Sequence, residues 1–226
     1  MTIGLQQRLS KLLTNSRFWI FASGIVLSIN IAGLIQLFIP AGILQTIRIE
    51  QSYGFMSILL LYLALLASPL TKVYPKLSFK AGYLHARRAI GVLAFYYAIL
   101  HAYLSFFQQL DGFSGVKYYN NKYSWSILLG MCALGVLCVM AVTSIDWAVE
   151  TLGFKRWKLL HRLVYLSGIA ILIHVVLIGT HYASLGLLST LTGVALAVLL
   201  WLEAIRLYRA KFVDEVSTQK GHREKY

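Results

Sequence analysis

Residues 157–180, WKLLHRLVYLSGIAILIHVVLIGT, form a long apolar run that contains two histidines, His161 and His174. The run is long enough to cross a membrane as a helix, which needs about 20 mainly apolar residues. Imidazole at membrane depth is costly, so a histidine there usually has a function. Thirteen residues of helix separate the two rings by roughly 20 Å, which places them near opposite faces of the membrane.

Five further apolar stretches accompany this run, and together they indicate an all-α integral membrane protein. Of the 226 residues, 58% are hydrophobic and only 13% are charged, and the mean hydropathy is +0.69. A water-soluble domain of this length rarely has such a composition. The sequence therefore predicts a six-helix transmembrane bundle with spans at residues 18–38, 53–70, 89–110, 125–145, 157–180 and 185–207.

The net charge of +13 comes from lysines and arginines that are distributed according to the predicted spans and do not cluster on one soluble face. We therefore expect no nucleic-acid partner. If the N-terminus is cytoplasmic, all 21 Lys and Arg except Arg48, Lys117 and Lys122 fall on the cytoplasmic side. This asymmetry predicts a multi-pass protein of the inner (plasma) membrane. We expect a cytoplasmic N-terminal segment at 1–17, one transmembrane domain at 18–207, and a cytoplasmic tail at 208–226.

Cysteine usage and motif content exclude two kinds of protein. Cys132 and Cys138 both lie in the fourth predicted span and no loop contains a cysteine, which excludes a disulfide framework. No glycine-rich nucleotide fingerprint follows a strand-like segment, and the tail after Leu207 is too short for a flavin or nicotinamide domain. We therefore expect any such electron donor to be a separate protein.

The third and fifth predicted spans both run from the cytoplasm outward, and each carries a histidine several residues before its outer end. His101 and His174 are therefore expected at matching depth, while His181 is interpreted as a histidine at the outer water boundary. Two imidazoles from facing helices are a suitable ligand pair for six-coordinate haem iron. We predict a b-type haem between spans 3 and 5. The alternative is a pair of core histidines bonded to neighbouring hydroxyls or carbonyls.

A second haem near the cytoplasmic face would use His161, with His85 as its natural partner on the third span. Sixteen residues separate His85 from His101, about 160° around a regular helix, whereas Arg87 shares the face of His101. Two interpretations stay open. Either the helix begins irregularly and His85 binds the iron, or Arg87 and Arg88 bind haem propionates or a flavin phosphate while another group completes the iron.

The connection between the fourth and fifth spans, residues 143–156, contains residues that favour a short helix along the membrane surface. Ser144 and Asp146 are residues of the type that caps helix N-termini, and Trp147 is typical of a membrane interface. We therefore expect a short interfacial helix in this connection.

Residues 87–101, RRAIGVLAFYYAILH, resemble the third-span signature of ferric-reductase-like transmembrane domains. Together with the segments further along the chain, the resemblance covers about residues 68–174. A second set of segments resembles, more specifically, the haem-binding membrane subunit of the periplasmic methionine sulfoxide reductase system: TSIDW at 143–147, LG at 152–153, WKLLHRLVY at 157–165, and His174.

This resemblance implies a six-span b-type cytochrome that passes electrons across the membrane, with His101, His161 and His174 as haem ligands. It does not supply the remaining inner ligand. In that group, electrons come from the quinone pool or from a cytosolic flavin reductase that uses FMN bound on the membrane subunit. They leave to a periplasmic reductase. The implied cofactors are thus one or two haems b, with FMN or quinone, and the implied partners are lipid, a flavin reductase or quinol, and a periplasmic catalytic subunit.

Three functions stay open at this point. The first is an electron-transfer component of an oxidoreductase, not a complete enzyme. The second is a stand-alone ferric (metal) reductase that acts at the outer haem. The third is a non-haem transporter or scaffold whose histidines bind a metal ion or protons. The first is favoured because the chain shows neither a donor domain nor an evident outer substrate pocket.

Overall fold

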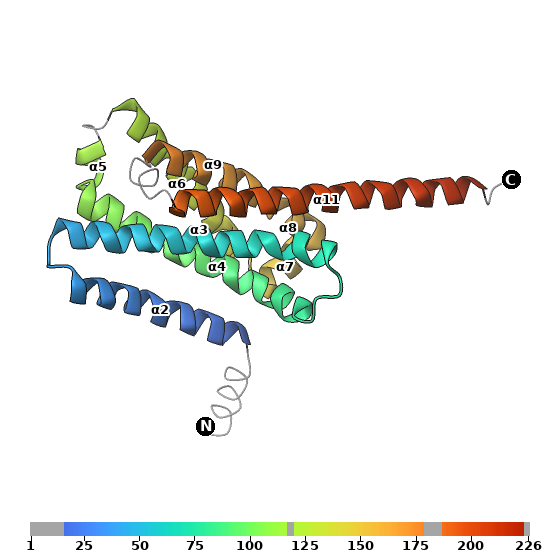
Figure 1. The fold of residues 1–226 in the computed structure, drawn as a ribbon, viewed down its shortest axis with the longest axis horizontal. Helices are drawn as coiled ribbons and strands as arrows, with labels where there is room; N and C mark the ends of the chain where they lie inside the picture. Colours follow the sequence, from blue (N-terminus) through green and yellow to red (C-terminus); the bar gives the residue numbers. More distant parts are fainter. Residues whose placement is uncertain (1–15, 117–119, 179–186, 224–226) are drawn as a thin grey trace, which may run out of the picture. The chain divides into compact units, whose positions relative to one another are not determined.

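The computed structural model describes residues 16–116, 120–178 and 187–223, and every regular element in these ranges is helical (Figure 1). Six helices among these residues are long and apolar enough to cross a membrane, which confirms the expected all-helical class. The elements are, in chain order, α2 (Ser16–Phe38), α3 (Ile43–Val73), α4 (Lys80–Leu104), the π-helical turn η1 (Ser105–Gln109), α5 (Gly112–Val116), α6 (Asn121–Val142), α7 (Asp146–Leu152), α8 (Phe154–Leu160), α9 (Leu163–Ile178) and α11 (Leu187–Arg223).

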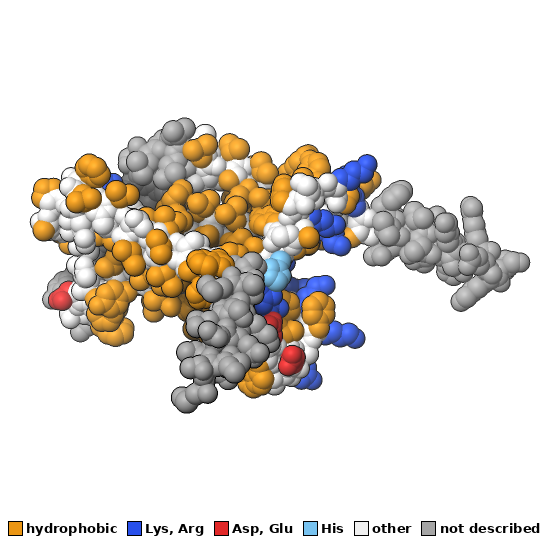
Figure 2. All heavy atoms as spheres, turned by 90° about the horizontal axis from the view of Figure 1, so that it is seen from below, with side chains coloured by type: hydrophobic (Ala, Val, Ile, Leu, Met, Phe, Trp, Pro, Cys, Tyr) orange, Lys and Arg blue, Asp and Glu red, His pale blue; other side chains and the backbone are white. Residues whose placement is uncertain are grey.

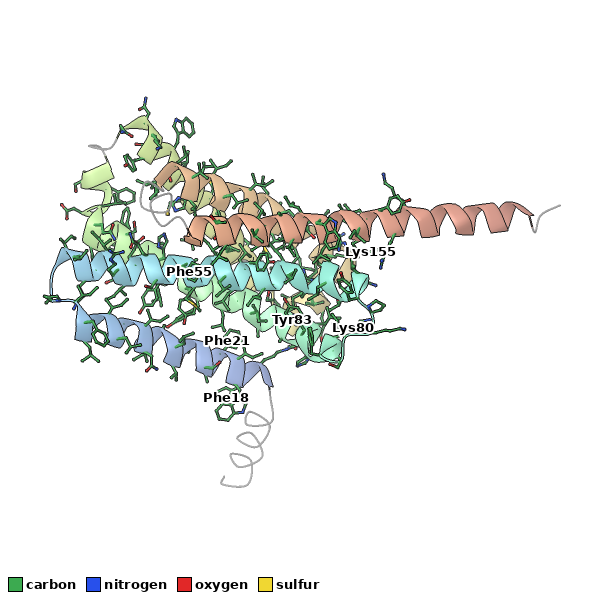
Figure 3. The ribbon with its side chains drawn as sticks, viewed as in Figure 1. Phe18, Phe21, Phe55, Lys80, Tyr83 and Lys155 are labelled. Atoms are coloured by element: carbon green, nitrogen blue, oxygen red, sulfur yellow. The ribbon has the colours of Figure 1, made fainter. Side chains whose placement is uncertain are left out.

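Two helices begin well before the spans that hydropathy predicts. Helix α3 begins at Ile43 where the prediction begins at residue 53, and α4 begins at Lys80 where the prediction begins at residue 89. Lys80 and Tyr83, labelled in Figure 3, lie in the first turns of α4. Charged and amide side chains lower the hydropathy of such turns, but most of them are good helix formers. The polar first turns of α3 therefore belong to the same rigid helix as its apolar part.

The fifth predicted span is interrupted. The span itself is confirmed, over Phe154–Ile178, but helix α8 ends at Leu160 and α9 begins at Leu163, which leaves His161 and Arg162 between the two helices. The chain stays hydrogen-bonded through the interruption by tighter bonds, from Arg162 N to the Leu159 carbonyl at 3.1 Å and from Val164 N to the His161 carbonyl at 3.4 Å. Such i→i+3 bonds are those of a 3₁₀ turn. His161 therefore lies at the end of α8, outside any continuous helix.

The chain forms two compact units, one of residues 1–64 with 86–181 and the other of residues 65–85 with 182–226. In the second unit, the Arg209 guanidinium donates to the Val73 carbonyl, with Nη1 2.9 Å from the oxygen. This bond satisfies a carbonyl at the C-terminal end of α3, where helices leave their last carbonyls without partners.

In the first unit, tyrosine hydroxyls on α3 and α4 donate to backbone carbonyls of α2. Tyr53 Oη lies 3.0 Å from the Ser28 carbonyl oxygen, and the fully buried Tyr97 places its Oη 2.8 Å from that of Gly24. A Cβ at Gly24 would overlap a methyl carbon of Leu93 on α4. Glycine therefore lets α2 and α4 approach closely enough for these bonds to form.

Helices α6 and α9 pack against each other within the same unit. Ala133 and Leu137 of α6 and Val164 and Ser167 of α9 are buried. The Ser167 hydroxyl donates to the Ala133 carbonyl at 3.4 Å. Small residues at such an interface let two helix backbones approach closely in lipid.

The outward faces of the spans are apolar, as expected for helices that contact lipid. Large side chains are strongly exposed on the helix surfaces, including Leu37 at 79% and Val176 at 75%. Phe18, at the start of α2, is exposed and points away from α3 (Figure 3). Hydrophobic side chains cover most of the described surface in the view of Figure 2. An exposed apolar surface of this extent is typical of a membrane or partner contact.

Candidate functional site

The first histidine of the predicted outer pair, His101, lies near the end of α4, four residues before η1. Its Nδ1 is 2.7 Å from Glu50 Oε1 and 3.2 Å from the Glu50 backbone oxygen, both on α3. The Glu50 residue is buried, with 8% of its surface exposed. A Cβ at Gly54, one helical turn further along α3, would lie 2.9 Å from His101 Nδ1. The imidazole therefore occupies space that any residue other than glycine would fill.

The second histidine, His174, has a closely similar environment between α9 and α6. Its Nδ1 is 2.8 Å from the Ser126 backbone oxygen and 3.1 Å from Ser126 Oγ. The Ser126 hydroxyl, fully buried, donates in turn to the His174 carbonyl at 2.9 Å. A Cβ at Gly130 would lie 2.9 Å from Nδ1 and from Cε1 of the ring.

The two environments follow one helical pattern, a polar residue followed four positions later by glycine. In an α-helix the carbonyl of one residue bonds to the N–H four residues later, and the side chain of that later residue lies beside the carbonyl. Gly54 and Gly130 have no side chain, so the carbonyls of Glu50 and Ser126 stay accessible to an imidazole N–H. Each imidazole therefore packs against a glycine of the neighbouring helix, in the space that a side chain would fill. We call these two positions, Gly54 and Gly130, the glycine gaps.

The imidazole rings of His101 and His174 lie close to each other. The ring centroids of His101 and His174 are 6.2 Å apart and their planes are nearly perpendicular, at 89°. Both Nδ1 atoms are engaged by oxygen acceptors, and within the described ranges neither Nε2 has a hydrogen-bond partner. Each ring is therefore held by one nitrogen and has the other available, the usual arrangement of a metal-binding histidine.

The donor set fits haem better than a simple metal ion. Among residues 16–116, 120–178 and 187–223, no group of three or more His, Cys, Asp or Glu could hold a metal ion. Protein zinc sites use three or four such ligands, whereas haem iron needs only axial ligands from the protein. His101 and His174 come from different helices, and their ring centroids are 6.2 Å apart, so the two imidazoles could together hold one haem iron.

The third predicted ligand, His161, lies in a different environment at the end of α8. Its Nε2 is 3.3 Å from Thr143 Oγ1, and its ring centroid is 4.1 Å from that of Trp157. The Trp157 indole N–H donates to the Thr143 carbonyl at 2.9 Å. The Arg88 guanidinium lies over the indole, 5.7 Å from the ring centroid, in a cation–π arrangement. We call Thr143, Trp157, His161 and Arg88 the basic aromatic cluster.

Both arginines that were predicted to bind propionates or phosphate contact protein acceptors. Arg88 donates to the Asp146 carboxylate, and Arg87 Nε donates to the Ala64 carbonyl at 2.9 Å. Arg17 of α2 also approaches Asp146, with Nη1 3.6 Å from Oδ2. The hydrogen bond from Arg88, together with the charges of Arg88 and Arg17, holds the pKa of the Asp146 carboxyl below its ordinary value.

Residues 143–156 contain the expected short helix, α7, but its cap differs from the expectation. The N-cap is Ile145, which makes no capping bond with its side chain. The Ser144 hydroxyl instead donates back to the Met140 carbonyl at 2.7 Å, so the expected cap by Ser144 is wrong. Asp146 lies in the first turn, where its negative charge suits both the helix dipole and the nearby arginines.

The remaining candidate ligand, His85, is exposed and belongs to the second unit. Helix α4 is regular from Lys80 to Leu104, so the irregular beginning that would turn His85 toward the face of His101 is absent from this helix. The pairing of His85 with His161 stays a prediction. His181 lies outside the residues that the structure describes.

Sequence reasoning missed the acceptors of both outer histidines. Glu50 lies before the predicted second span, and Ser126 was one of many small polar residues in apolar sequence. The signal that could have found them is the matched spacing of a polar residue and a glycine, at Glu50 and Gly54 and again at Ser126 and Gly130. Such a spacing is frequent in apolar sequences, and its role becomes evident only from the positions of the two imidazoles in the structure.

These observations define a helical membrane protein of several spans, in which two imidazoles from different helices face each other inside one compact unit. The family model described as ferric reductase like transmembrane component matches residues 53–173, which is more than half of the chain. The chain therefore belongs to this family, as the resemblance of its motifs indicated.

Individual relatives point in the same direction. The chain is 30% identical over 154 residues to the protein-methionine-sulfoxide reductase heme-binding subunit MsrQ of Brucella anthropi, which covers 67% of this chain and 66% of the relative. It is 36% identical over 131 residues to the MsrQ of Agrobacterium fabrum, 57% of each chain. It is also 37% identical over 98 residues to the magnetosome protein MamZ of Magnetospirillum gryphiswaldense, 42% of this chain and 15% of the relative. The matches thus span at most 66% of the length of these relatives.

Proposed function

We propose that the chain is a haem-binding membrane subunit that transfers electrons, with a b-type haem held between α4 and α9 by His101 and His174. The observation that carries this proposal is the facing pair of imidazoles, each fixed through Nδ1 and each with Nε2 available. Relatives whose names describe a heme-binding subunit support it. When bound, haem supplies one-electron chemistry, while the protein supplies position and potential.

A second site at the basic aromatic cluster would complete a path across the membrane. Thirteen residues of α4 separate Arg88 of this cluster from His101, a rise of about 20 Å. We propose that His161 binds a second haem there, with His85 or another group as the opposite ligand. Arg87 and Arg88 would then exchange their present acceptors for haem propionates or for the phosphate of a bound FMN.

The catalytic partner is proposed from the names of the relatives, the donor and the periplasmic exit from the resemblance of the motifs, and the membrane orientation from the charge distribution. We propose electron entry on the cytoplasmic side, from quinol or from a cytosolic flavin reductase, and exit to a periplasmic methionine sulfoxide reductase subunit. Both termini would be cytoplasmic in an inner membrane, because the lysines and arginines concentrate on that side of the predicted topology. The chain would then be a component of an oxidoreductase that acts with a separate catalytic subunit.

The test is the absorbance spectrum of the detergent-purified chain, oxidised and then reduced with dithionite, with haem quantified per polypeptide. A b-type spectrum with two haems supports the full path, and one haem supports a single histidine site and leaves the other side of the membrane to flavin or quinone. Absence of haem in protein made with ample haem supply contradicts the proposal and favours a transporter or scaffold. Rapid reoxidation of the reduced chain by a ferric chelate, without any partner protein, would instead favour the stand-alone ferric reductase that the family description suggests.

A further inference from the structure

Glu50 is a buried carboxylate in a membrane-spanning helix, and the proposed function does not yet use it. It lies in the first turns of α3 and is 8% exposed. A carboxylate at this depth is expensive and marks a functional site with a specific partner. That partner is His101, whose Nδ1 lies 2.7 Å from Glu50 Oε1.

We propose that Glu50 is a positioning residue that orients the His101 imidazole and lowers the reduction potential of the outer haem. Ser126 orients His174 in the corresponding way but without a charge. This inference rests on the proposed function, because it takes His101 and His174 as the two axial ligands. It assigns unequal roles to the acceptors of two imidazoles whose surroundings are otherwise alike.

Orientation follows from the hydrogen bonds. An oxygen acceptor at Nδ1 requires the proton on that nitrogen, so Nε2 carries the lone pair that a metal needs. Partners of this kind on the far side of the imidazole fix its tautomer and ring angle and raise its basicity. Glu50 and Ser126 each supply two oxygens to one Nδ1, one from the backbone and one from the side chain.

The difference in potential follows from charge. Ferric iron carries one more positive charge than ferrous iron, so a nearby negative charge stabilises the ferric state and lowers the reduction potential. The Glu50 carboxylate supplies such a charge through the His101 ring, whereas the Ser126 hydroxyl is neutral. Low polarity in the membrane interior strengthens the effect relative to water.

The experiment is a redox titration of the purified, haem-loaded full chain in three variants. Glu50→Gln keeps size and an oxygen acceptor but removes the charge. Ser126→Ala changes no charge and removes the hydroxyl that accepts from His174 Nδ1 and donates to the His174 carbonyl. Glu150→Gln makes the same charge change at an exposed position on α7. We expect Glu50→Gln to shift the reduction equilibrium toward ferrous haem about tenfold, or about 59 mV for one electron. Ser126→Ala shifts it less, because the Ser126 carbonyl remains 2.8 Å from Nδ1, and Glu150→Gln leaves it unchanged.

A second readout is the low-temperature electron paramagnetic resonance signal of the ferric haem, which we expect to change in Glu50→Gln. A potential and a ferric signal equal to those of Glu150→Gln would overturn the proposal. If Glu50→Gln does not fold, Glu50→Met replaces it, because it also removes the charge at similar side-chain length: a positive shift supports the role of Glu50, and an unchanged potential overturns it. Failure of the proposed function is seen beforehand and separately, as a wild-type chain without haem or as full haem retention in His174→Ala.

Discussion

The outer histidine pair and the basic aromatic cluster show how differently one chain can hold the same side chain. His101 and His174 are fixed through Nδ1 by backbone and side-chain oxygens, and each has Nε2 available. At His161 the hydroxyl of Thr143 approaches Nε2, and the ring lies against Trp157. The outer pair is therefore already organised to receive a group between two rings, whereas the inner histidine must exchange a partner to bind iron.

The backbone explains part of this difference. His101 and His174 lie within helices that pack against neighbouring helices, so a glycine gap in the neighbour can receive each ring. His161 lies at the interruption between α8 and α9, where no regular helix continues to fix its direction. Its orientation depends on Thr143 and Trp157 instead, and both of these contacts can rearrange with a side-chain rotation.

The largest expected effect is the loss of the outer haem in His174→Ala or His101→Ala. Because both rings bind the same iron in our proposal, either change should remove the same haem, whereas His161→Ala should leave it in place. The measurement is haem content per polypeptide with the dithionite-reduced spectrum. Full haem content with an unchanged spectrum in His174→Ala would show that the assignment of the outer pair is wrong.

Next in size is the effect of filling the glycine gaps. Gly54→Ala and Gly130→Ala would place a Cβ 2.9 Å from an imidazole, so each ring must move away from its acceptors. Loss of the hydrogen bonds that orient a metal-binding histidine weakens cofactor binding, and we expect a loss of roughly tenfold in haem affinity. Haem titration of the chain produced without haem measures the loss. Gly33→Ala and Gly135→Ala are the matched controls, since nothing lies within 4 Å of a Cβ at either position.

The proposed second haem site, at the basic aromatic cluster, is tested by His161→Ala. We expect this change to remove the haem that survives in His174→Ala, so the double variant should contain no haem. Haem content of the two single variants and of the double variant measures this directly. Haem retained at the wild-type level in His161→Ala would remove the basic aromatic cluster from the electron path.

The smallest effect concerns the ion pair that joins α7 to Arg88 and Arg17. The arginines lower the pKa of the Asp146 carboxyl, so the stabilisation is complete above its ordinary pKa and is lost as pH falls through the lower pKa of the folded state. We expect the melting temperature of the wild type to approach that of Asp146→Asn below about pH 4. Thermal melts in detergent from pH 7 to pH 3 measure the difference. A constant difference between the two proteins over this range would contradict the assignment.

Hydropathy was sufficient to predict the six spans, because a membrane-crossing helix needs an uninterrupted apolar run of about 20 residues. Helical rise was sufficient to predict that His101 and His174 lie close together, because it converts the number of residues from a span end into depth. The position of Glu50 was not predictable in this way, because charged first turns of α3 resemble a loop in hydropathy. The acceptors of Arg88 and Arg87 also lay beyond sequence reasoning, since Asp146 and Ala64 are distant along the chain. The interruption at His161 has no breaker residue to signal it.

The backbone carbonyls that receive His101 and His174 have a consequence for natural variation. A carbonyl is present whatever residue occupies positions 50 and 126, so each histidine keeps one acceptor through any substitution there. Access to that carbonyl depends on the absence of a side chain at Gly54 and Gly130. Among descendants of this chain, the two glycines should therefore be the slower-changing positions, while a substitution at residue 50 or 126 keeps the backbone acceptor and changes the potential.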